Sequence, residues 1–194
     1  MRIYRSLRIG PSAVLAFLAF VTAGLAGCAS FGFGGDPAER NLVLRGHDPV
    51  AYFTAGKAVP GDASLRAEHR GNAYRFSSED NRRLFVASPD RFVPQFEGLC
   101  ADHMVYALPV EGDPQVFKIV EGRLYLFEDA RSRAYFEMDQ ELNVRRAAQY
   151  WDAEVREGNR TLQYFKRLVW RVPHFKSDGE LSDEYARRFG RRPG

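Results

Sequence analysis

The chain has 194 residues, of which 45% are hydrophobic and 13% aromatic; this is enough for one hydrophobic core and too little for two ordinary domains. The formal net charge of +3 arises in the first ten residues, which contain Arg2, Arg5 and Arg8 and no acid. The remaining residues carry 25 basic and 25 acidic side chains. This balance excludes the basic excess that is typical of nucleic-acid-binding proteins.

The N-terminus has the layout of a secretory signal. Behind the three arginines, an uncharged run rich in Ala, Leu, Phe and Val extends from Ile9 to Ser30. A transmembrane helix is the alternative, because residues 11–27 are nearly long enough to span a bilayer.

The end of this run, Leu25-Ala26-Gly27-Cys28, resembles the bacterial lipobox. The resemblance implies that residues 1–27 are a signal peptide and that Cys28 becomes an acylated, palmitate-bearing N-terminus. One acyl chain anchors a protein only marginally, and lipoproteins of this kind carry several. Ala29 follows rather than Asp, which resembles lipoproteins sent to the outer membrane. We therefore expect a lipid-anchored protein on the periplasmic side of the bacterial cell envelope, with a Gly-rich flexible tether over residues 28–40.

Cys100 is the only other cysteine. With Cys28 acylated, no intrachain disulfide can form. An unpaired thiol in an oxidising compartment is open to reaction unless it is buried or ligated.

Strands and turns are predicted in the first part of the domain, which begins near Asn41. Residues 41–44 (NLVL) indicate a short strand, and Asp48-Pro49 a turn. A hairpin is predicted over residues 65–76, with its turn at Arg70-Gly71-Asn72 and with Tyr74 and Phe76 on one face.

A helix is predicted next, capped by Ser77 or Ser78 and ended by Pro89. Its apolar face consists of Leu84 and Phe85. A second hairpin follows over residues 115–127, where Glu121-Gly122 supplies the turn.

Helical spacing dominates the remainder of the chain. One apolar series is Tyr135, Met138 and Leu142, and the next is Val144, Ala148, Trp151 and Val155. Further helices are predicted over residues 160–170, stopped by Pro173, and over residues 181–189. No internal repeat is apparent. Strands precede helices, which predicts an α+β fold with a small antiparallel sheet of hairpins, packed by helices and followed by a helical C-terminal extension.

Three segments together resemble the YHS domain family, in its longer bacterial branch. They are residues 46–53 (GHDPVAYF), 71–101 (GNAYRF to GLCA) and 113–127 (DPQVFKIVEGRLYLF). The resemblance covers about residues 42–152 and predicts a YHS-like domain at 41–155, followed by a basic helical extension at 156–194. Short members of the family are linked to heavy-metal proteins through three cysteines. In this sequence the three cysteine positions are occupied by Ala51, Ser77 and Asn81. The resemblance therefore supports the fold but weakens the prediction of metal binding at these positions.

Soft metal ligands cluster around Cys100, which is followed by His103 and Met104. Thiolate, imidazole and thioether suit Cu(I), or zinc if Asp102 joins them. A further ligand would have to come from His47 or, failing that, from His69. Two other interpretations stay open: Cys100 is a buried core residue, or it is a redox sensor.

A thiol-dependent enzyme is a further alternative. Cys100 with His47 or His103, oriented by Asp48 or Asp102, would supply a nucleophile and its base. The sequence contains no Gly-rich oxyanion loop or nucleophile elbow, so we assign no catalytic residue and no cofactor-binding residue.

Residues 158–177 combine basic and aromatic side chains without an acid. This segment either lies on anionic lipid head groups or packs its aromatic side chains on the domain. The function we expect is a non-enzymatic binding module, anchored in the envelope, for a small ligand or a soft metal ion. The alternative is a structural module that docks on a membrane or on a protein partner.

Overall fold

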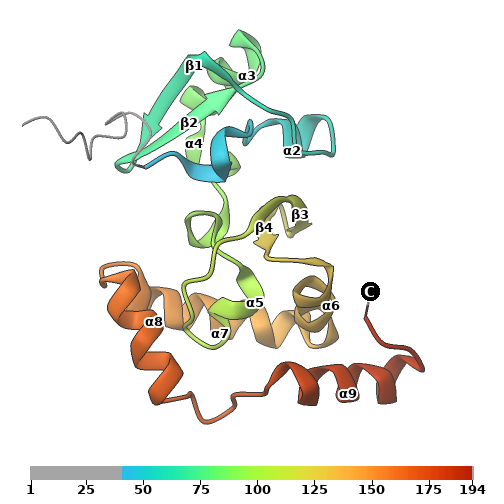
Figure 1. Cartoon of the computed structure of the whole chain (residues 1–194). Coiled ribbons are helices and arrows are strands. Elements are labelled where there is room, and N and C mark those ends of the chain that lie inside the picture. Colours follow the sequence, from blue (N-terminus) through green and yellow to red (C-terminus); the bar gives the residue numbers. More distant parts are fainter. Residues whose placement is uncertain (1–40, 194) are drawn as a thin grey trace, which may run out of the picture. The chain divides into compact units, whose positions relative to one another are not determined.

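The computed structural model describes residues 41–193 (Figure 1). The predicted signal peptide, Cys28 and the tether over residues 28–40 lie outside the described residues. The chain from Asn41 onward forms one compact domain. It contains two antiparallel two-stranded sheets packed by helices, which confirms the predicted α+β class and the helical C-terminal part.

The elements follow one another in an order that repeats. The first series is η3 (Val43–Gly46), α2 (Ala51–Thr54), β1 (Asp62–His69), β2 (Asn72–Phe76), α3 (Glu79–Ala87) and α4 (Pro89–Phe92). The second is η4 (Gln95–Gly98), α5 (Ala101–Met104), β3 (Asp113–Val120), β4 (Arg123–Phe127) and α6 (Ala130–Met138). The C-terminal part consists of α7 (Gln140–Tyr150), the π-helical turn η5 (Trp151–Val155), α8 (Arg160–Val169) and α9 (Asp178–Phe189).

Residues 41–87, the first unit, and residues 94–138, the second unit, share their backbone plan in detail. Both begin with a 3-10 turn whose two central residues have left-handed φ angles. Both hairpins are antiparallel and shift register once, after Asp62 and after Asp113. The expectation of no internal repeat is therefore wrong at the level of structure. The sequence hides the repeat because it preserves glycines and aromatic residues at a few positions while the other side chains differ.

Strand β4 lies between two hydrophobic cores, and its side chains are buried on both faces. Leu124 and Leu126 belong to the core of the first unit. Tyr125 and Phe127 belong to a second core, which also contains Cys100 and residues of the C-terminal helices. Successive side chains of a strand point to opposite faces, so this one strand joins both cores.

The first unit is organised around the buried carboxylate of Asp48. Its Oδ1 accepts hydrogen bonds from the backbone N–H groups of Val50, at 2.8 Å, and Ala51, at 3.3 Å. Its Oδ2 accepts from the N–H and hydroxyl of Ser77, at 2.8 and 2.6 Å, and from the side-chain amide of Asn81, at 2.7 Å. One side chain thereby joins the start of α2, the end of β2 and the first turn of α3. Buried polar groups need such partners.

Two sequence expectations in the first unit are wrong. Residues 41–44 form no strand, because Val43 and Leu44 enter the 3-10 turn and only Leu42 makes a bridge, to Ala73. The helix after the first hairpin buries Phe85 against Tyr74 and Phe76 but leaves Leu84 48% exposed. Ser78, rather than Ser77, caps this helix.

Further corrections concern helix ends. The apolar series from Tyr135 to Leu142 does not form one helix, because Asp139 adopts a non-helical conformation between α6 and α7. Pro89 does not end α3, which stops at Ala87, and instead begins α4. The last helix starts at Asp178, earlier than predicted, behind a capping box formed by Ser177.

We expect Asp48→Ala to lower the free energy of unfolding by about 3 kcal/mol or more, because it leaves several donors without their acceptor. Urea unfolding followed by circular dichroism measures the change. Asp62→Ala is the matched control, since Asp62 is exposed and accepts local hydrogen bonds from Ser64. Equal stability of the Asp48 and Asp62 variants would contradict this account of the first unit.

Candidate functional site

Cys100 takes the place in the second unit that Asp48 takes in the first. It precedes the short helix α5, donates its backbone N–H to the carbonyl of Val110 at 2.8 Å, and makes a bridge to Leu126. The backbone N–H groups of His103 and Glu128 and the side chain of Ser132 face its sulfur and act to lower the pKa of the thiol. These three residues correspond in the repeat to Ala51, Ser77 and Asn81.

The predicted contact between Cys100 and His103 is present. His103 Nδ1 lies 3.2 Å from the sulfur, and its Nε2 lies 3.5 Å from a carboxylate oxygen of Glu128. Burial raises the pKa of the Cys100 thiol to about 12 in spite of the surrounding donors. Burial also lowers the pKa of His103, although Glu128 acts in the opposite direction. A neutral thiol beside a neutral imidazole is not an activated nucleophile.

The other predicted ligands lie elsewhere. Met104 is completely buried in the second core. His47 directs Nδ1 at the carbonyl of Leu44, at 2.9 Å, and Nε2 at the side-chain amide of Gln115, at 3.4 Å. His69 pairs with Asp90 at 2.9 Å.

Among residues 41–193, no group of three or more His, Cys, Asp or Glu side chains is arranged to hold a metal ion. Of the predicted histidine ligands, the structure brings His103 to the Cys100 sulfur, while His47 and His69 have other partners.

A small cavity of about 190 Å³ lies beside His103. Asp102 contributes to its wall and is 6% exposed. Burial, together with repulsion from Asp129, raises the pKa of Asp102 to about 8. At neutral pH this carboxyl group is therefore predominantly protonated. The sequence gave no sign that Asp102 is buried with a raised pKa, apart from its position next to His103.

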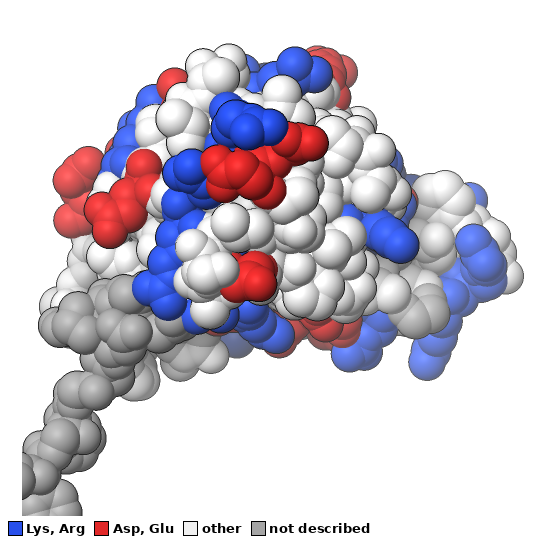
Figure 2. Space-filling view, turned by 90° about the horizontal axis from the view of Figure 1, so that it is seen from above, with Lys and Arg blue, Asp and Glu red and all other residues white. Residues whose placement is uncertain are grey.

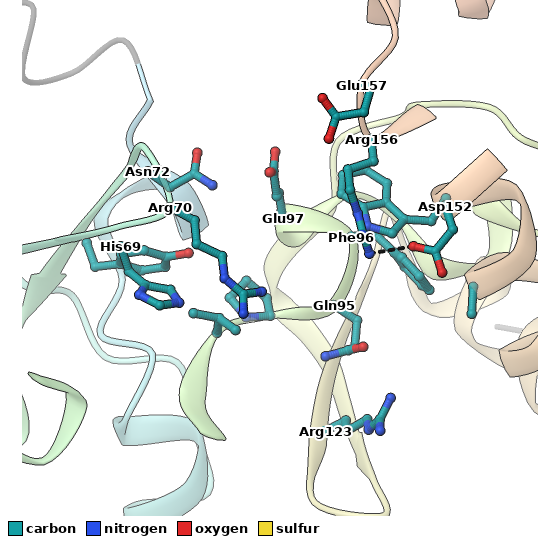
Figure 3. A pocket seen from close by; sticks show the side chains of 15 residues that line it. His69, Arg70, Asn72, Gln95, Phe96, Glu97, Arg123, Asp152, Arg156 and Glu157 are labelled. Atoms are coloured by element: carbon teal, nitrogen blue, oxygen red, sulfur yellow. Dashed lines mark ion pairs between the residues drawn. The ribbon is translucent and has the colours of Figure 1, made fainter. Parts of the chain in front are cut away.

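A cleft of about 630 Å³ is the feature that sequence reasoning missed (Figure 3). Four separate segments line it: the tip of the β1–β2 hairpin, the link into η4, the start of β4, and the region around η5. Its lining residues are His69, Arg70, Asn72, Tyr74, Val93, Pro94, Gln95, Phe96, Glu97, Arg123, Ala148, Trp151, Asp152, Arg156 and Glu157. No local sequence signal links these four segments.

One wall of the cleft is aromatic. The rings of Phe96 and Trp151 lie 5.9 Å apart, and the guanidinium of Arg156 lies 5.9 Å above the Trp151 ring. Trp151 begins the π-helical turn, whose wide hydrogen bond runs from the N–H of Arg156 to the carbonyl of Trp151 at 2.9 Å. π-Helical turns are rare in proteins, and a large share of those that exist lie at functional sites. The left-handed backbone at Phe96 is not specific to the cleft, since the first unit has the same turn.

Most charges in the cleft are already paired. Arg70 pairs with Asp90 at 3.0 Å, and Arg156 pairs with Asp152 (Figure 3). Glu97 pairs with Arg160, which lies outside the cleft. Within the part of the chain that the structure describes, Arg123 and Glu157 line the cleft without an ion pair. Figure 3 places them at opposite ends of the cleft, which therefore has one end that favours anions and one that favours cations.

The face seen in Figure 2 carries charges of both signs. Basic and acidic side chains lie next to one another on its left and in its centre, and mainly basic ones lie at its right-hand end. No helix within residues 41–193 is long and apolar enough to cross a membrane.

Comparisons of the chain with models of protein families, with curated proteins and with solved structures found no match.

Cys100 should resist alkylation in the native protein. At pH 8, a pKa of about 12 leaves about one thiol in 10⁴ ionised, and burial denies reagents access to it. We expect iodoacetamide to modify Cys100 at least a hundred times more slowly in buffer than in 6 M guanidinium chloride. Mass spectrometry of the Cys100 peptide measures the rate. Native alkylation as fast as that of the denatured chain would restore the redox-sensor interpretation.

Asp102 should make stability depend on pH. Its raised pKa means that the folded state keeps a proton that the unfolded chain loses near pH 4. The contribution of Asp102 to stability is therefore complete below about pH 4 and declines until about pH 8. We expect Asp102→Asn to match the wild type at pH 4 and to exceed its unfolding free energy at pH 8 by up to about 5 kcal/mol.

Urea unfolding at several pH values measures this difference. Asp183→Asn is the control, because Asp183 is an exposed aspartate on α9. A difference between Asp102→Asn and wild type that does not change with pH would contradict a raised pKa at Asp102.

Proposed function

We propose that this chain is a lipid-anchored, non-enzymatic binding protein of the bacterial envelope, built on a YHS-like domain. Its ligand site is the cleft of about 630 Å³ between the hairpin tips and the π-helical turn. The observation that carries the proposal is this cleft, because a concave site with an aromatic wall and a few unmatched polar groups is the usual form of a small-molecule site.

The arrangement around Asp48 supports the family resemblance. Ala51, Ser77 and Asn81, which stand where short family members have cysteines, surround a single carboxylate. Positions that share a ligand in one branch of a family would have to converge in this way. In this chain the carboxylate of Asp48 occupies the centre and satisfies the donors, so the first unit offers no vacant set of soft ligands.

The cleft favours a particular class of ligand. Phe96 and Trp151 line the cleft but are only 5% and 7% exposed, so they offer a narrow aromatic strip to the edge of an apolar or aromatic body. Arg123 offers a guanidinium to an acidic group, and the side-chain amide of Gln95 lies on the same part of the wall (Figure 3). Glu157, at the other end, repels an acid and thereby orients the ligand. We therefore propose a small aromatic or apolar acid as the ligand class.

An enzymatic role finds less support. The only thiol within residues 41–193 is Cys100, which is completely buried and whose pKa is raised. The cleft lining contains no cysteine or serine, and the single imidazole in it, that of His69, is paired with Asp90.

Naphthalene-1-sulfonate, an aromatic anion, is a suitable probe of the cleft. We expect isothermal titration of the full chain to show saturable binding that Arg123→Ala weakens about five- to tenfold, as expected from the loss of one partly exposed ionic contact. Ala148→Phe, which fills the cleft, should abolish the binding.

Arg83→Ala is the matched control, because Arg83 is an exposed arginine on α3 outside the cleft. Saturable binding that survives both Arg123→Ala and Ala148→Phe would refute the cleft as the ligand site. Absence of binding to the wild type would refute the proposed ligand class.

A further inference from the structure

Helix α8 presents an apolar face to solvent (orange in Figure 1). Leu162 is 69% exposed, Val169 68% and Trp170, the residue that ends the helix, 68%. Phe165 and Leu168 are more than half exposed as well. We call these five residues the α8 apolar face. Scattered single apolar residues are normal on a surface, whereas a contiguous set marks an interaction site.

The side of α8 that contacts the rest of the chain is polar. Gln163 is buried and donates to the carbonyl of Ala107 at 3.2 Å and to the carboxylate of Glu154 at 3.1 Å. Lys166 and Arg167 form ion pairs with the same carboxylate. The orientation is thus the reverse of that of an ordinary surface helix, which buries its apolar stripe in the protein. The prediction that the aromatic side chains pack on the domain is wrong for Phe165 and Trp170.

The chemistry around the face fits a lipid bilayer. Residues 158–177 contain no acid. Arg160 is exposed but pairs with Glu97, so within residues 41–193 Arg171 is the exposed cation of this segment that has no ion pair. Tryptophan and tyrosine favour the interface between lipid and water, and Trp170 and Tyr164 are both exposed here. Short amphipathic helices of this composition bind in the plane of the head groups.

The chain outside the described residues points to the same occupant. An acyl anchor at Cys28 would be joined to Asn41 by 13 peptide units, which span at most about 45 Å when fully extended. The domain could therefore never move far from the bilayer surface, and a weak apolar contact would suffice to seat it.

A second copy of the chain is a poorer occupant. Helix α8 has 10 residues. It is therefore about 15 Å long and about 10 Å wide, and offers about 150 Å² in projection. A stable dimer buries about 800 Å² on each partner.

We propose that the α8 apolar face inserts into the head-group region of the bilayer to which the chain is anchored. The inference rests on the lipid anchor of the proposed function and is independent of ligand binding in the cleft. It gives the domain a fixed side toward the membrane.

Tryptophan fluorescence tests the insertion, because the chain has only two tryptophans. The full chain is reconstituted into phosphatidylcholine–phosphatidylglycerol vesicles with plain or brominated acyl chains. We expect brominated lipid to quench most of the Trp170 emission, obtained as the difference between wild type and Trp170→Phe. Leu162→Asp with Phe165→Asp should abolish this quenching. Leu84→Asp with Val86→Asp, which changes two exposed apolar residues on α3, should leave it intact.

Vesicle flotation distinguishes the lipid anchor of the proposed function from the insertion of the α8 apolar face. A chain that floats with the vesicles but shows equal Trp170 emission in plain and brominated lipid would overturn the insertion and leave the anchor standing. A chain that does not float would overturn both. Quenching that persists in the Leu162 and Phe165 double variant would also overturn the role of the α8 apolar face. Trp170 emission that shifts with protein concentration in the absence of lipid would indicate that a second copy covers the α8 apolar face, and would likewise overturn the proposed insertion.

Discussion

Burial of β4 on both faces is the constraint on which the rest of the fold depends. A two-stranded hairpin is marginal on its own in water, so each of the two sheets needs apolar partners. Leu124 and Leu126 supply them to the first unit, while Tyr125 and Phe127 supply them to the helices of the second core. Because side chains alternate along a strand, a slip of one residue would exchange the two sets and disrupt both cores together.

Each unit adds to this framework one buried side chain that stands just before its short helix and faces its hairpin and its capped helix. In the first unit it is the carboxylate of Asp48, which carries charge and takes strong hydrogen bonds. In the second it is the sulfur of Cys100, a weak acceptor in an apolar setting. The same backbone plan thus tolerates a polar and a nearly apolar centre. The contact between Cys100 and His103 follows from this plan, and it does not by itself indicate catalysis.

Local chemistry made part of this structure predictable from the sequence. Gly71 and Gly122 adopt positive φ at the hairpin turns, where glycine is favoured, and both hairpins were predicted there. The left-handed conformation of Leu44 has no such signal, because tertiary contacts impose it on an ordinary residue. The position of His47 and the orientation of α8 were likewise unpredictable: the first depends on a backbone carbonyl, and the second on the buried contacts of Gln163. The cleft is formed by four segments that are distant in sequence, so no local sequence pattern predicts it.

The double-sided burial of β4 also has a mechanical consequence. Arg123, the first residue of the strand, lines the cleft, and Glu128, which follows its last residue, contacts His103 beside Cys100. About 17 Å of extended backbone separates the two. A strand clamped between two cores can neither bend nor slide freely, so it acts as a rigid spacer. The cleft and the Cys100–His103 pair are therefore held at a constant separation.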